Sequence, residues 1–404
     1  MRIIVVQPGQ LHITAHGASD QDQVTLLGRL KALGHDVTVF TRTAEHVESR
    51  DLDGFLQSLG VHAQILKPQY PWAHPKRFMN LGYLDGAAWQ YGDPVFLRRF
   101  GQLCTEYEPE LIWSHFSFCW PAALTAHRKG IPTVIRSINY EPSQYLQEHR
   151  DYNGPGKWLR YGGKLIGEHR ALQASDVLAA ITPREELIYQ GISRDTKVKL
   201  LPLLSLQSIL AEPCSLDMAG KRMPLKVVFM GASYRVRHNL DALKFIATQV
   251  VPIMRARCPD KFRFHIVGSK VPDNLLSMEA DDLRFEGFVP DIHSYLRNTD
   301  LAVAPSLCGT GMQQKVFEPL CRGIPTVTHG RALAGYSLAD GQHLLLAESA
   351  EDFATQLIHL LDLPLRHRIG RQGRERARKL FGQKQMDDHL EEILRAAIGR
   401  GEQR

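Results

Sequence analysis

The sequence predicts an α/β protein with two doubly wound domains that face each other across a cleft, and three observations carry this prediction. The 404 residues exceed what one compact core usually covers, so two domains of roughly 200 residues each are expected. The apolar share of 44% and the charged share of 23% are typical of a globular protein rather than a disordered or fibrous one. Short apolar runs also alternate with helical patterns twice along the chain, once in each half.

The first domain is predicted over residues 1–205 and begins as a βαβ unit. Residues 3–7 form a short apolar run, four leucines repeat at helical spacing within residues 24–33, and residues 37–41 form a second apolar run. Two strands joined by a helix imply a parallel sheet. The later apolar runs expected to be buried parallel strands are 111–114, 133–136, 177–181 and 198–201.

A second domain is predicted after a linker. Residues 206–224 show no clear periodicity and contain two prolines and a glycine, which is typical of a linker. The alternation that follows places the second domain at 225–382. The amphipathic tail 383–404 is expected to form a helix that packs back towards the first domain. The strands expected in the second domain are 226–231, 262–267, 283–285, 301–305 and 326–328.

Charge, cysteine usage and hydropathy limit the class of protein. The net charge of +6 is mild and no long block of like charges occurs, so no nucleic-acid partner is expected. The six cysteines form no C-x-x-C pair, which favours free thiols in a reducing cytoplasm. No apolar stretch is long enough for a membrane span or a signal peptide, so we expect a cytoplasmic protein with at most a peripheral contact at the inner membrane face. A solvated helix face is expected for Arg366, Arg368, Arg371, Arg374, Arg376 and Arg378.

The strongest candidate for a ligand site follows the strand expected at 301–305. A loop of mostly small residues, Ser306 to Gly311, leads into a helix that carries Lys315 and Glu318. Backbone N–H groups at a helix N-terminus form an anion site that suits a diphosphate, and Lys315 adds a positive charge. Glu318 is placed to accept hydrogen bonds from two ribose hydroxyls. Because Lys315 and Glu318 are three residues apart, an ordinary surface ion pair is the alternative.

Five segments of the second half form a pattern together. They are FMGASY from Phe229, HNLDA from His238, HIVG from His265, FEGFV from Phe285, and G-x-G-x-x-x-K-x-x-E followed by x-x-x-x-G-x-P from Gly309 onward. They resemble the donor domain of GT-B glycosyltransferases, most closely the retaining glycosyltransferase family 4. The resemblance implies two Rossmann-like domains. It also implies an enzyme that moves a hexosyl or related group from a nucleotide diphosphate sugar to an acceptor hydroxyl, without a metal or cofactor and with retained configuration.

The resemblance assigns donor-binding roles to residues of the second domain. It implies that Lys315 contacts the diphosphate and that Glu318 holds the donor ribose. Many family members carry a glutamate where this chain has Thr310, so the sugar stays open. The usual basic pair after the first strand of the domain is not at its common spacing, and Arg235 and Arg237 are the available substitutes. The residues expected to bind the donor are Gly17, Gly231, Arg235, Arg237, Gly309, Thr310, Gly311, Met312, Gln313, Lys315 and Glu318.

Three positions of the first domain are also candidates. Gly17 lies in the loop after the first strand, where the family has a small-residue loop beside the donor phosphate; a plain turn is the alternative. His115 ends a predicted strand, and its position resembles a family histidine that faces the transfer cleft, although a lone histidine is more often structural. The loop Asn139, Tyr140 and Glu141 resembles the acceptor side, with a helix N-terminal acid as the alternative for Glu141. The residues expected to act in catalysis are His115, Lys315 and Arg235.

Other interpretations stay open at the level of sequence. The D-x-D tripeptides at 20–22 and 51–53 would suit a metal-dependent transferase, but both begin predicted helices, where aspartate is a common capping residue. A nucleotide-sugar 2-epimerase of the same fold needs carboxylates in the first domain, and none has a distinctive context. A third interpretation is an inert nucleotide-sugar-binding subunit, motivated by Thr310. The sequence does not identify the nucleotide base (UDP or GDP type), the sugar, the oligomeric state, or whether the acceptor is a glycan, a lipid-linked saccharide or a small molecule.

Overall fold

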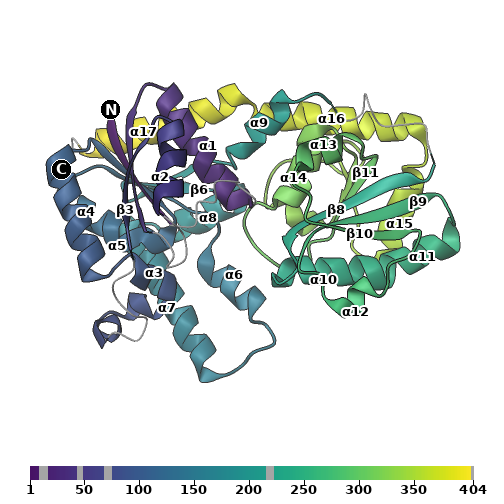
Figure 1. Ribbon diagram of the computed structural model, residues 1–404, viewed down its shortest axis with the longest axis horizontal. Helices are drawn as coiled ribbons and strands as arrows, with labels where there is room; N and C mark the ends of the chain where they lie inside the picture. The colour runs from purple at the N-terminus through teal and green to yellow at the C-terminus, as the bar shows by residue number, and fades with distance from the viewer. Residues whose placement is uncertain (9–16, 43–48, 68–74, 215–222, 402–404) are drawn as a thin grey trace. The chain divides into compact units, whose positions relative to one another are not determined.

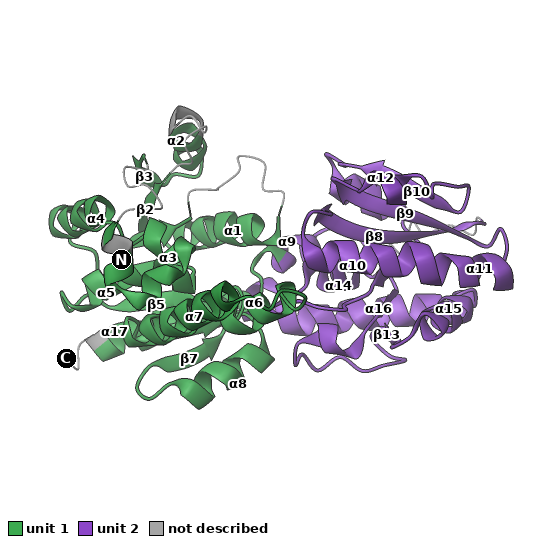
Figure 2. Ribbon diagram, turned by 90° about the horizontal axis from the view of Figure 1, so that it is seen from below, with its two compact units in different colours: residues 1–205, 386–404 green, residues 206–385 purple. Residues whose placement is uncertain are grey.

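The computed structural model folds into two compact units (Figure 1, Figure 2). Unit 1 consists of Met1–Ser205 together with Met386–Arg404, and unit 2 consists of Leu206–Gln385. None of the described helices is both long and apolar enough to cross a lipid bilayer. The structure describes residues 1–8, 17–42, 49–67, 75–214 and 223–401.

The sheet of unit 1 is parallel, as the βαβ opening predicts. Its strands are β1 (Arg2–Gln7), β2 (Asp36–Arg42), β3 (His62–Leu66), β4 (Leu111–His115), β5 (Thr133–Arg136), β6 (Val177–Ala180) and β7 (Lys197–Leu200). Over the described residues these seven strands run in the order β3-β2-β1-β4-β5-β6-β7. The order reverses between β1 and β4. Ligands bind at such a switch point, beyond the carboxyl ends of the strands.

Helices cover this sheet, and polar side chains cap the N-termini of some of them. They are α1 (Ala18–Ala32), α2 (Ser49–Ser58), α3 (Gly86–Gln90), α4 (Pro94–Tyr107), α5 (Trp120–His127), α6 (Glu141–Glu148), α7 (Pro155–Gln173) and α8 (Pro183–Ile192), with 3-10 turns η1 (Pro75–Met79), η2 (Leu81–Leu84) and η3 (Ser117–Cys119). Asp93 accepts hydrogen bonds from the N–H groups of Val95 and Phe96 at 3.0 Å each, which caps α4. Thr182 caps α8 by accepting from Glu185 N–H at 3.2 Å.

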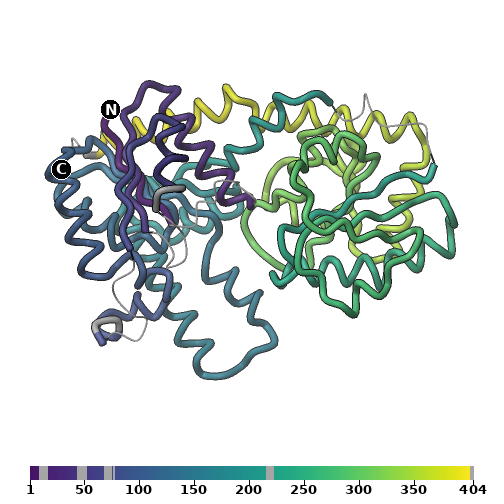
Figure 3. Tube along the Cα trace, viewed as in Figure 1, coloured from purple at the N-terminus to yellow at the C-terminus, as the bar shows by residue number. Residues whose placement is uncertain are grey.

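Helix α17 (Gln383–Gly401) carries the chain back into unit 1, to which its residues belong from Met386 on. Arg29 of α1 donates to both carboxylate oxygens of Asp387, at 2.9 and 2.5 Å. Lys199 of β7 pairs with Glu392 at 2.6 Å. Figure 3 shows the yellow end of the chain passing beside the purple α1. The apolar stripe of α17 is buried, as the amphipathic pattern of the tail predicts.

A buried ion pair joins three parts of unit 1. Asp22 of α1 and Arg136 of β5 are both fully buried, with 3.1 Å between Arg136 Nη2 and Asp22 Oδ2. Arg136 also donates to the carbonyls of Leu201 and Pro202, and Asp22 accepts from the N–H of Leu204 at 2.6 Å. Asp22, the second aspartate of the first D-x-D tripeptide, therefore fixes α1 and β5 to the segment that follows β7.

We predict that Asp22→Ala strongly destabilises unit 1, because it leaves the Arg136 guanidinium buried without its anion. Breaking a buried pair from one side costs about 3–5 kcal/mol in the free energy of unfolding. Urea unfolding followed by circular dichroism measures this change. The matched control is Glu108→Ala, whose carboxylate is 75% exposed and lies 3.7 Å from Arg2; its loss should cost below about 1 kcal/mol. Equal effects of the two variants would contradict the assignment.

Unit 2 contains a second parallel sheet. Its strands are β8 (Leu225–Ser233), β9 (Phe262–Ser269), β10 (Leu283–Gly287), β11 (Leu301–Ala304), β12 (Thr326–Thr328) and β13 (Leu345–Leu346). The six strands run in the order β10-β9-β8-β11-β12-β13 within the described part of the chain. The order reverses between β8 and β11. The loops after these two strands therefore lie at the switch point of unit 2.

Two hydrophobic cores cover the two faces of this sheet. Val227 and Phe229 of β8 enter one core, whereas Val228 between them enters the other, because successive side chains of a strand point to opposite faces. The helices are α9 (Ser205–Ala211), α10 (Arg237–Phe245), α11 (Val251–Arg257), α12 (Asp273–Leu276), α13 (Ile292–Arg297), α14 (Gln314–Arg322), α15 (Ala350–His359) and α16 (Leu363–Phe381), with a π turn at Ile246–Val250 and the 3-10 turn η6 (Gly330–Leu333).

Two stretches differ from the expectations drawn from the sequence. The stretch 206–224, expected to be a linker, begins inside α9, where Leu206 and Ile209 are buried; residues 215–222 lie outside the described ranges. The solvated face expected for α16 is wrong for Arg366 and Arg374, which are 3% and 5% exposed. Both donate to carbonyls at the C-terminal ends of other helices, which lack partners within those helices: Arg366 to Leu360 at 2.9 Å, and Arg374 to Leu210 at 3.1 Å.

Candidate active site

Gly231 lies near the end of β8, at the first loop of the switch point in unit 2. A β-carbon added there would lie 3.1 Å from the Tyr234 ring and 3.3 Å from the Asn239 side chain. Both neighbours are held in place: the Tyr234 hydroxyl donates to the Val267 carbonyl at 2.8 Å, and Asn239 Nδ2 donates to the Ser233 carbonyl at 3.2 Å. A side chain at Gly231 would therefore displace Asn239.

The second loop of the switch point joins β11 to α14 and needs two glycines. Gly309 and Gly311 have φ angles of 98° and 73°, a left-handed conformation that glycine adopts without strain. Arg331 supports the loop from behind, donating to the carbonyls of Ser306 at 3.3 Å and Gly309 at 3.1 Å. Gln313, the N-cap residue of α14, donates to the Ser306 hydroxyl at 2.6 Å. The loop also contains the partly exposed Thr310 and the buried Met312.

Lys315 in the first turn of α14 connects the two loops. Its Nζ lies 3.4 Å from Asn239 Oδ1 and 5.5 Å from the centre of the Phe229 ring, so it stands over the end of β8. Burial lowers the pKa of Lys315 to about 8, against a smaller opposing effect of Cys308. Burial and the Lys315 charge together lower the pKa of His238 to about 4. The site thus combines a helix N-terminus with a cation, next to a neutral histidine.

The two candidate arginines lie after β8 in different surroundings. Arg237 Nε pairs with Asp241 Oδ2 at 3.0 Å, one turn along α10. Arg235 is exposed, and its backbone N–H donates to the Ser233 hydroxyl at 3.3 Å. The structure therefore brings Lys315 to the loop after β8, whereas the guanidinium of Arg237 already has a carboxylate partner.

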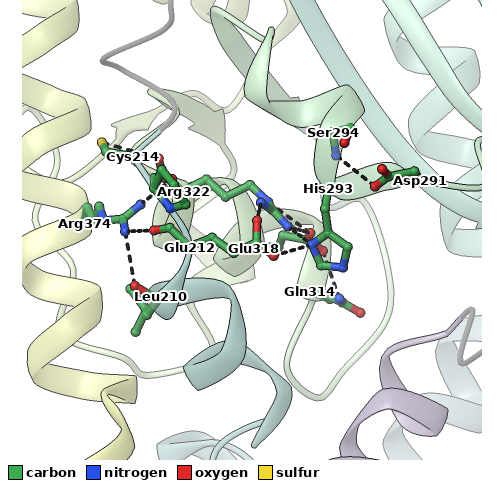
Figure 4. A network of polar contacts seen from close by, with 11 residues as sticks. Leu210, Glu212, Cys214, Asp291, His293, Ser294, Gln314, Glu318, Arg322 and Arg374 are labelled. Carbon is green, nitrogen blue, oxygen red and sulfur yellow. Dashed lines mark hydrogen bonds and ion pairs between the residues drawn. The ribbon is translucent and has the colours of Figure 1, made fainter.

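Glu318 is buried, and its partners differ from the surface ion pair considered from the sequence. Its Oε1 accepts from Arg322 Nε at 3.2 Å and Nη2 at 2.9 Å, and its Oε2 accepts from Gln314 at 2.9 Å (Figure 4). Glu318 is 5% exposed and Arg322 is 1% exposed. The alternative of a Lys315–Glu318 surface pair is therefore wrong. Oε1 already accepts two hydrogen bonds, whereas Oε2 accepts one and retains a second lone pair that could accept a ribose hydroxyl.

Arg322 also ties α14 to the segment that follows α9. Its Nη1 donates to Glu212 at 2.7 Å, and its Nη2 lies 2.5 Å from His293 Nδ1. His293 Nδ1 is in turn 2.8 Å from Glu212 Oε1. Arg374 donates to the carbonyls of Leu210 and Glu212, beside Arg322 in Figure 4. The helix that carries Lys315 and Glu318 is therefore fixed from behind by charged groups.

We predict that Arg322→Met destabilises unit 2, because Glu318 and Glu212 both lose their cation. Removal of one partner from a buried pair costs about 3–5 kcal/mol in the free energy of unfolding. Guanidinium-induced unfolding measures the loss. Arg378→Met on α16 is the matched control, since Arg378 is exposed, and it should stay within about 0.5 kcal/mol of the wild type. A stable Arg322→Met protein would show that the guanidinium is dispensable.

In unit 1, Gly17 lies between β1 and α1, and His115 lies at the end of β4. Gly17 is the N-cap residue of α1, and its carbonyl accepts from Gln21 N–H at 3.0 Å; residues 9–16 before it are outside the described ranges. His115 ends β4 and is 1% exposed. Burial first, and the charge of Arg136 second, hold the pKa of His115 well below its usual value. The imidazole is therefore neutral at physiological pH.

The predicted acceptor-side loop lies after β5, at the start of α6. Asn139 Nδ2 donates to Glu141 Oε1 at 2.9 Å, and Lys164 Nζ of α7 donates to Glu141 Oε2 at 2.6 Å. Lys164 also lies 3.6 Å from Asp85. Burial raises the pKa of Glu141, although Lys164 opposes this effect. Glu141 is thus a helix N-terminal acid and also the centre of a polar cluster.

Glu168 of α7 is a buried carboxyl group that reasoning from the sequence missed. It is 2% exposed. Its Oε1 accepts from the Ser117 hydroxyl at 2.9 Å and from Glu141 N–H at 3.2 Å, and its Oε2 accepts from the Tyr189 hydroxyl at 2.9 Å. Burial, followed by repulsion from Glu141, raises the pKa of Glu168 to about 8. The one signal in the sequence that could have indicated a buried carboxyl group is that Glu168 lies among glycine, leucine and alanine residues of α7.

Among the residues that the structure describes, no group of three His, Cys, Asp or Glu side chains lies together as a metal site would require. Gly231, the Gly309–Gln313 loop, Lys315 and Glu318 come together in unit 2. His115 and the loop Asn139–Glu141 belong to unit 1.

Two family models match the chain. The model of the glycosyl transferase 4-like domain matches residues 23–203, and that of glycosyl transferases group 1 matches residues 224–363. The first match falls in unit 1 and the second in unit 2, which contains the Gly309 loop. No curated protein sequence matches the chain significantly.

Solved structures share the fold over the whole chain. Sucrose-phosphate synthase from Thermosynechococcus elongatus has a TM-score of 0.66 at 16% identity, covering 99% of this chain and 100% of that one. HepE from Anabaena in complex with UDP and glucose has a TM-score of 0.65 at 14% identity, covering 98% and 100%. A putative UDP-N-acetylglucosamine 2-epimerase from Listeria monocytogenes has a TM-score of 0.59 at 12% identity, covering 99% and 98%.

The two sheets, their switch points and these neighbours define a GT-B protein. The prediction of a GT-B, family 4-like protein is thereby confirmed. The chain belongs to the glycosyl transferases of group 1, with a glycosyl transferase 4-like domain in its N-terminal half. It is a glycosyltransferase.

Proposed function

We propose that this glycosyltransferase uses a nucleotide diphosphate sugar held mainly by unit 2, and that it retains the anomeric configuration without a metal ion. The observation that carries the proposal is the position of Lys315 in the first turn of α14, over the end of β8 and after a loop with two left-handed glycines. A helix N-terminus and a cation at a switch point favour a diphosphate. Arg235 is exposed after β8 and is the second proposed diphosphate contact.

Glu318 is the proposed partner of the donor ribose. Arg322 keeps its carboxylate paired and fixed, so the free lone pair of Oε2 is oriented before the donor binds. Gly17 and Gly231 would let the backbone approach the donor. Met312 and Gln313, at the end of the loop before α14, are also proposed to contact it. Structures similar in fold, HepE and VinC, are described with UDP-glucose and with DTDP respectively, which supports a nucleotide diphosphate donor here. We propose a base of UDP or GDP type.

The proposed chemistry is a front-face displacement. The bond between the sugar anomeric carbon and the diphosphate oxygen breaks while the acceptor oxygen bonds to the same face of that carbon. The acceptor proton passes to the departing phosphate oxygen. Lys315, the α14 N-terminus and Arg235 stabilise the charge that develops on the diphosphate. Neutral His115 orients the sugar or the acceptor rather than serving as an obligatory base.

Acceptor binding is assigned to Asn139, Tyr140 and Glu141 after β5. The chemistry of the loop suits hydroxyl groups of a glycan, a lipid-linked saccharide or a small molecule. We also propose a cytoplasmic location, with any membrane contact peripheral at the inner face. Incubation of the protein with UDP- and GDP-sugars and a panel of such acceptors tests the function. Transfer to none of them, together with no nucleotide binding, would refute the proposal.

A second candidate function is 2-epimerisation of a nucleotide sugar. It is favoured by one observation, the adjacent carboxyl groups of Glu141 and Glu168 in unit 1, where acid and base carboxylates would be needed. The likeness in fold to a putative epimerase is compatible with it. Incubation with a nucleotide sugar alone separates the two functions: an epimerised sugar without acceptor would replace the transferase. Binding without any turnover would instead indicate an inert subunit.

We predict that Lys315→Met weakens UDP or GDP binding, because the diphosphate loses a charge-assisted contact. Loss of one such contact should raise Kd about 10-fold to 100-fold, measured by isothermal titration calorimetry. Lys244→Met is the matched control, since Lys244 is exposed on α10 and should leave Kd unchanged. An unchanged Kd in Lys315→Met would remove Lys315 from the donor site.

We also predict that nucleotide affinity falls as pH rises from 7 to 9. The pKa of Lys315 is lowered to about 8, so its positive charge is present at pH 7 and lost progressively above pH 8. Kd should therefore increase with pH in the wild type, whereas Lys315→Met should show the weaker affinity at every pH. Parallel pH profiles in the two proteins would contradict the assignment.

A further inference from the structure

Two strand ends and two helices converge on the Glu168 carboxyl group inside unit 1. Ser117 follows β4, Glu141 follows β5, and Tyr189 lies in α8. All three donate to Glu168 of α7 at distances from 2.9 to 3.2 Å. Ser117 and Glu168 are 3% and 2% exposed, and Tyr189 is fully buried. This cluster contacts the acceptor-side loop from inside the domain.

The same helices hold the rest of that loop. The hydroxyl groups of Ser137 and Tyr189 lie 2.9 Å apart, and the N–H of Tyr140 donates to Glu185 of α8 at 2.8 Å. Ser137 at the beginning of the loop is therefore linked to Glu168 through Tyr189, and Glu141 at its end is linked directly. The backbone between β5 and α6 is thus tied at both ends to one carboxyl group.

The charged and titratable groups around Glu168 come from α6, α7, α8 and the segment before α3. Glu141 lies on α6, and its charge is the largest electrostatic influence on Glu168. Lys164 on α7 binds Glu141 at 2.6 Å and also pairs with Asp85, which precedes α3. Tyr189 faces Glu168 from α8. Since the cation serves Glu141 and Asp85, Glu168 has three hydrogen-bond donors and a neighbouring carboxylate instead.

A neutral Glu168 matters for the geometry of the loop. Ionisation would place a second negative charge beside the Glu141 carboxylate in a site that excludes water, where like charges repel strongly. The neutral carboxyl group can hold all three contacts without this repulsion. Its pKa of about 8 means that the neutral form dominates at pH 7 and is lost as pH rises.

We propose that Glu168 is a positioning residue for sugar transfer, which fixes the loop of Asn139, Tyr140 and Glu141 against the end of β4 and thereby sets acceptor affinity. The role rests on the proposed function, because acceptor binding is assigned to that loop. Glu168 itself is buried and touches no substrate. Its effect should therefore appear in KM for the acceptor and leave KM for the donor unchanged.

Glu168→Leu and Glu168→Gln test the proposal together. Leucine removes every acceptor of the three donors, whereas the glutamine amide still accepts from Ser117 and Glu141 and can donate to the Tyr189 hydroxyl. We expect Glu168→Leu to raise acceptor KM about 10-fold or more through loss of these hydrogen bonds, and Glu168→Gln to stay near the wild type at pH 7. Glu106→Gln, on the exposed side of α4, is the control.

The pH profile distinguishes positioning from general support of the fold. In the wild type, acceptor KM should rise between pH 7 and pH 9 as Glu168 ionises. Glu168→Gln cannot ionise there, so its acceptor KM should stay flat while the rise in donor KM caused by Lys315 persists. An acceptor KM profile identical in wild type and Glu168→Gln would overturn the proposal, as would equal changes of both KM values in Glu168→Leu.

Hydrogen exchange followed by mass spectrometry gives a readout that needs no activity. Peptides covering residues 137–148 should lose protection about 10-fold in Glu168→Leu and keep it in Glu168→Gln. If Glu168→Leu does not fold, Tyr189→Phe replaces it, because that change removes one donor and the link to Ser137 with little change in volume. Unchanged protection in Glu168→Leu, or in Tyr189→Phe where Glu168→Leu does not fold, would overturn the positioning role. If the wild type transfers no sugar, yet the variants show the predicted exchange pattern, the proposed function is refuted and the positioning of the loop is not.

Discussion

A guanidinium group shielded from water needs acceptors within the protein, and in each unit a buried arginine with such acceptors joins elements that are distant in sequence. Arg136 is fully buried in unit 1 and connects α1, β5 and the segment after β7. Arg322 is 1% exposed in unit 2 and connects α14 to Glu212 and His293. A buried charge without partners is very costly. Each arginine therefore favours the arrangement in which the elements that it joins supply its hydrogen-bond acceptors.

The partners of two buried glutamates explain why they behave differently. Glu318 accepts two hydrogen bonds from Arg322, which balance its negative charge at the proposed ribose site. Glu168 faces hydroxyl groups, a backbone N–H and the carboxylate of Glu141, and the result is a pKa of about 8. One residue type thus supplies a charged acceptor in unit 2 and a neutral anchor in unit 1. The distinction arises from neighbours contributed by other elements.

Local patterns were sufficient to predict much of the fold. The βαβ opening, the strands with long apolar runs and the glycine loop before Lys315 all follow from residues close together in sequence. Strands β3 and β13 were not predicted, since one carries half-exposed polar residues and the other spans only two residues. Helix α9 is seven residues long, too short to show a helical period, and so resembled a linker.

The candidate site also contains some residues that local sequence patterns indicate and others that only tertiary contacts reveal. Glycine φ angles and helix N-termini are local properties, so the Gly309–Lys315 segment could be found from its own sequence. The ion pair of Glu318 joins residues four apart, yet its arginine also donates to Glu212, 110 positions away. Glu168 receives hydrogen bonds from three separate elements, none of which marks it in the sequence. The groups proposed to contact ligands therefore leave local patterns, whereas the groups that hold them in place depend on tertiary contacts.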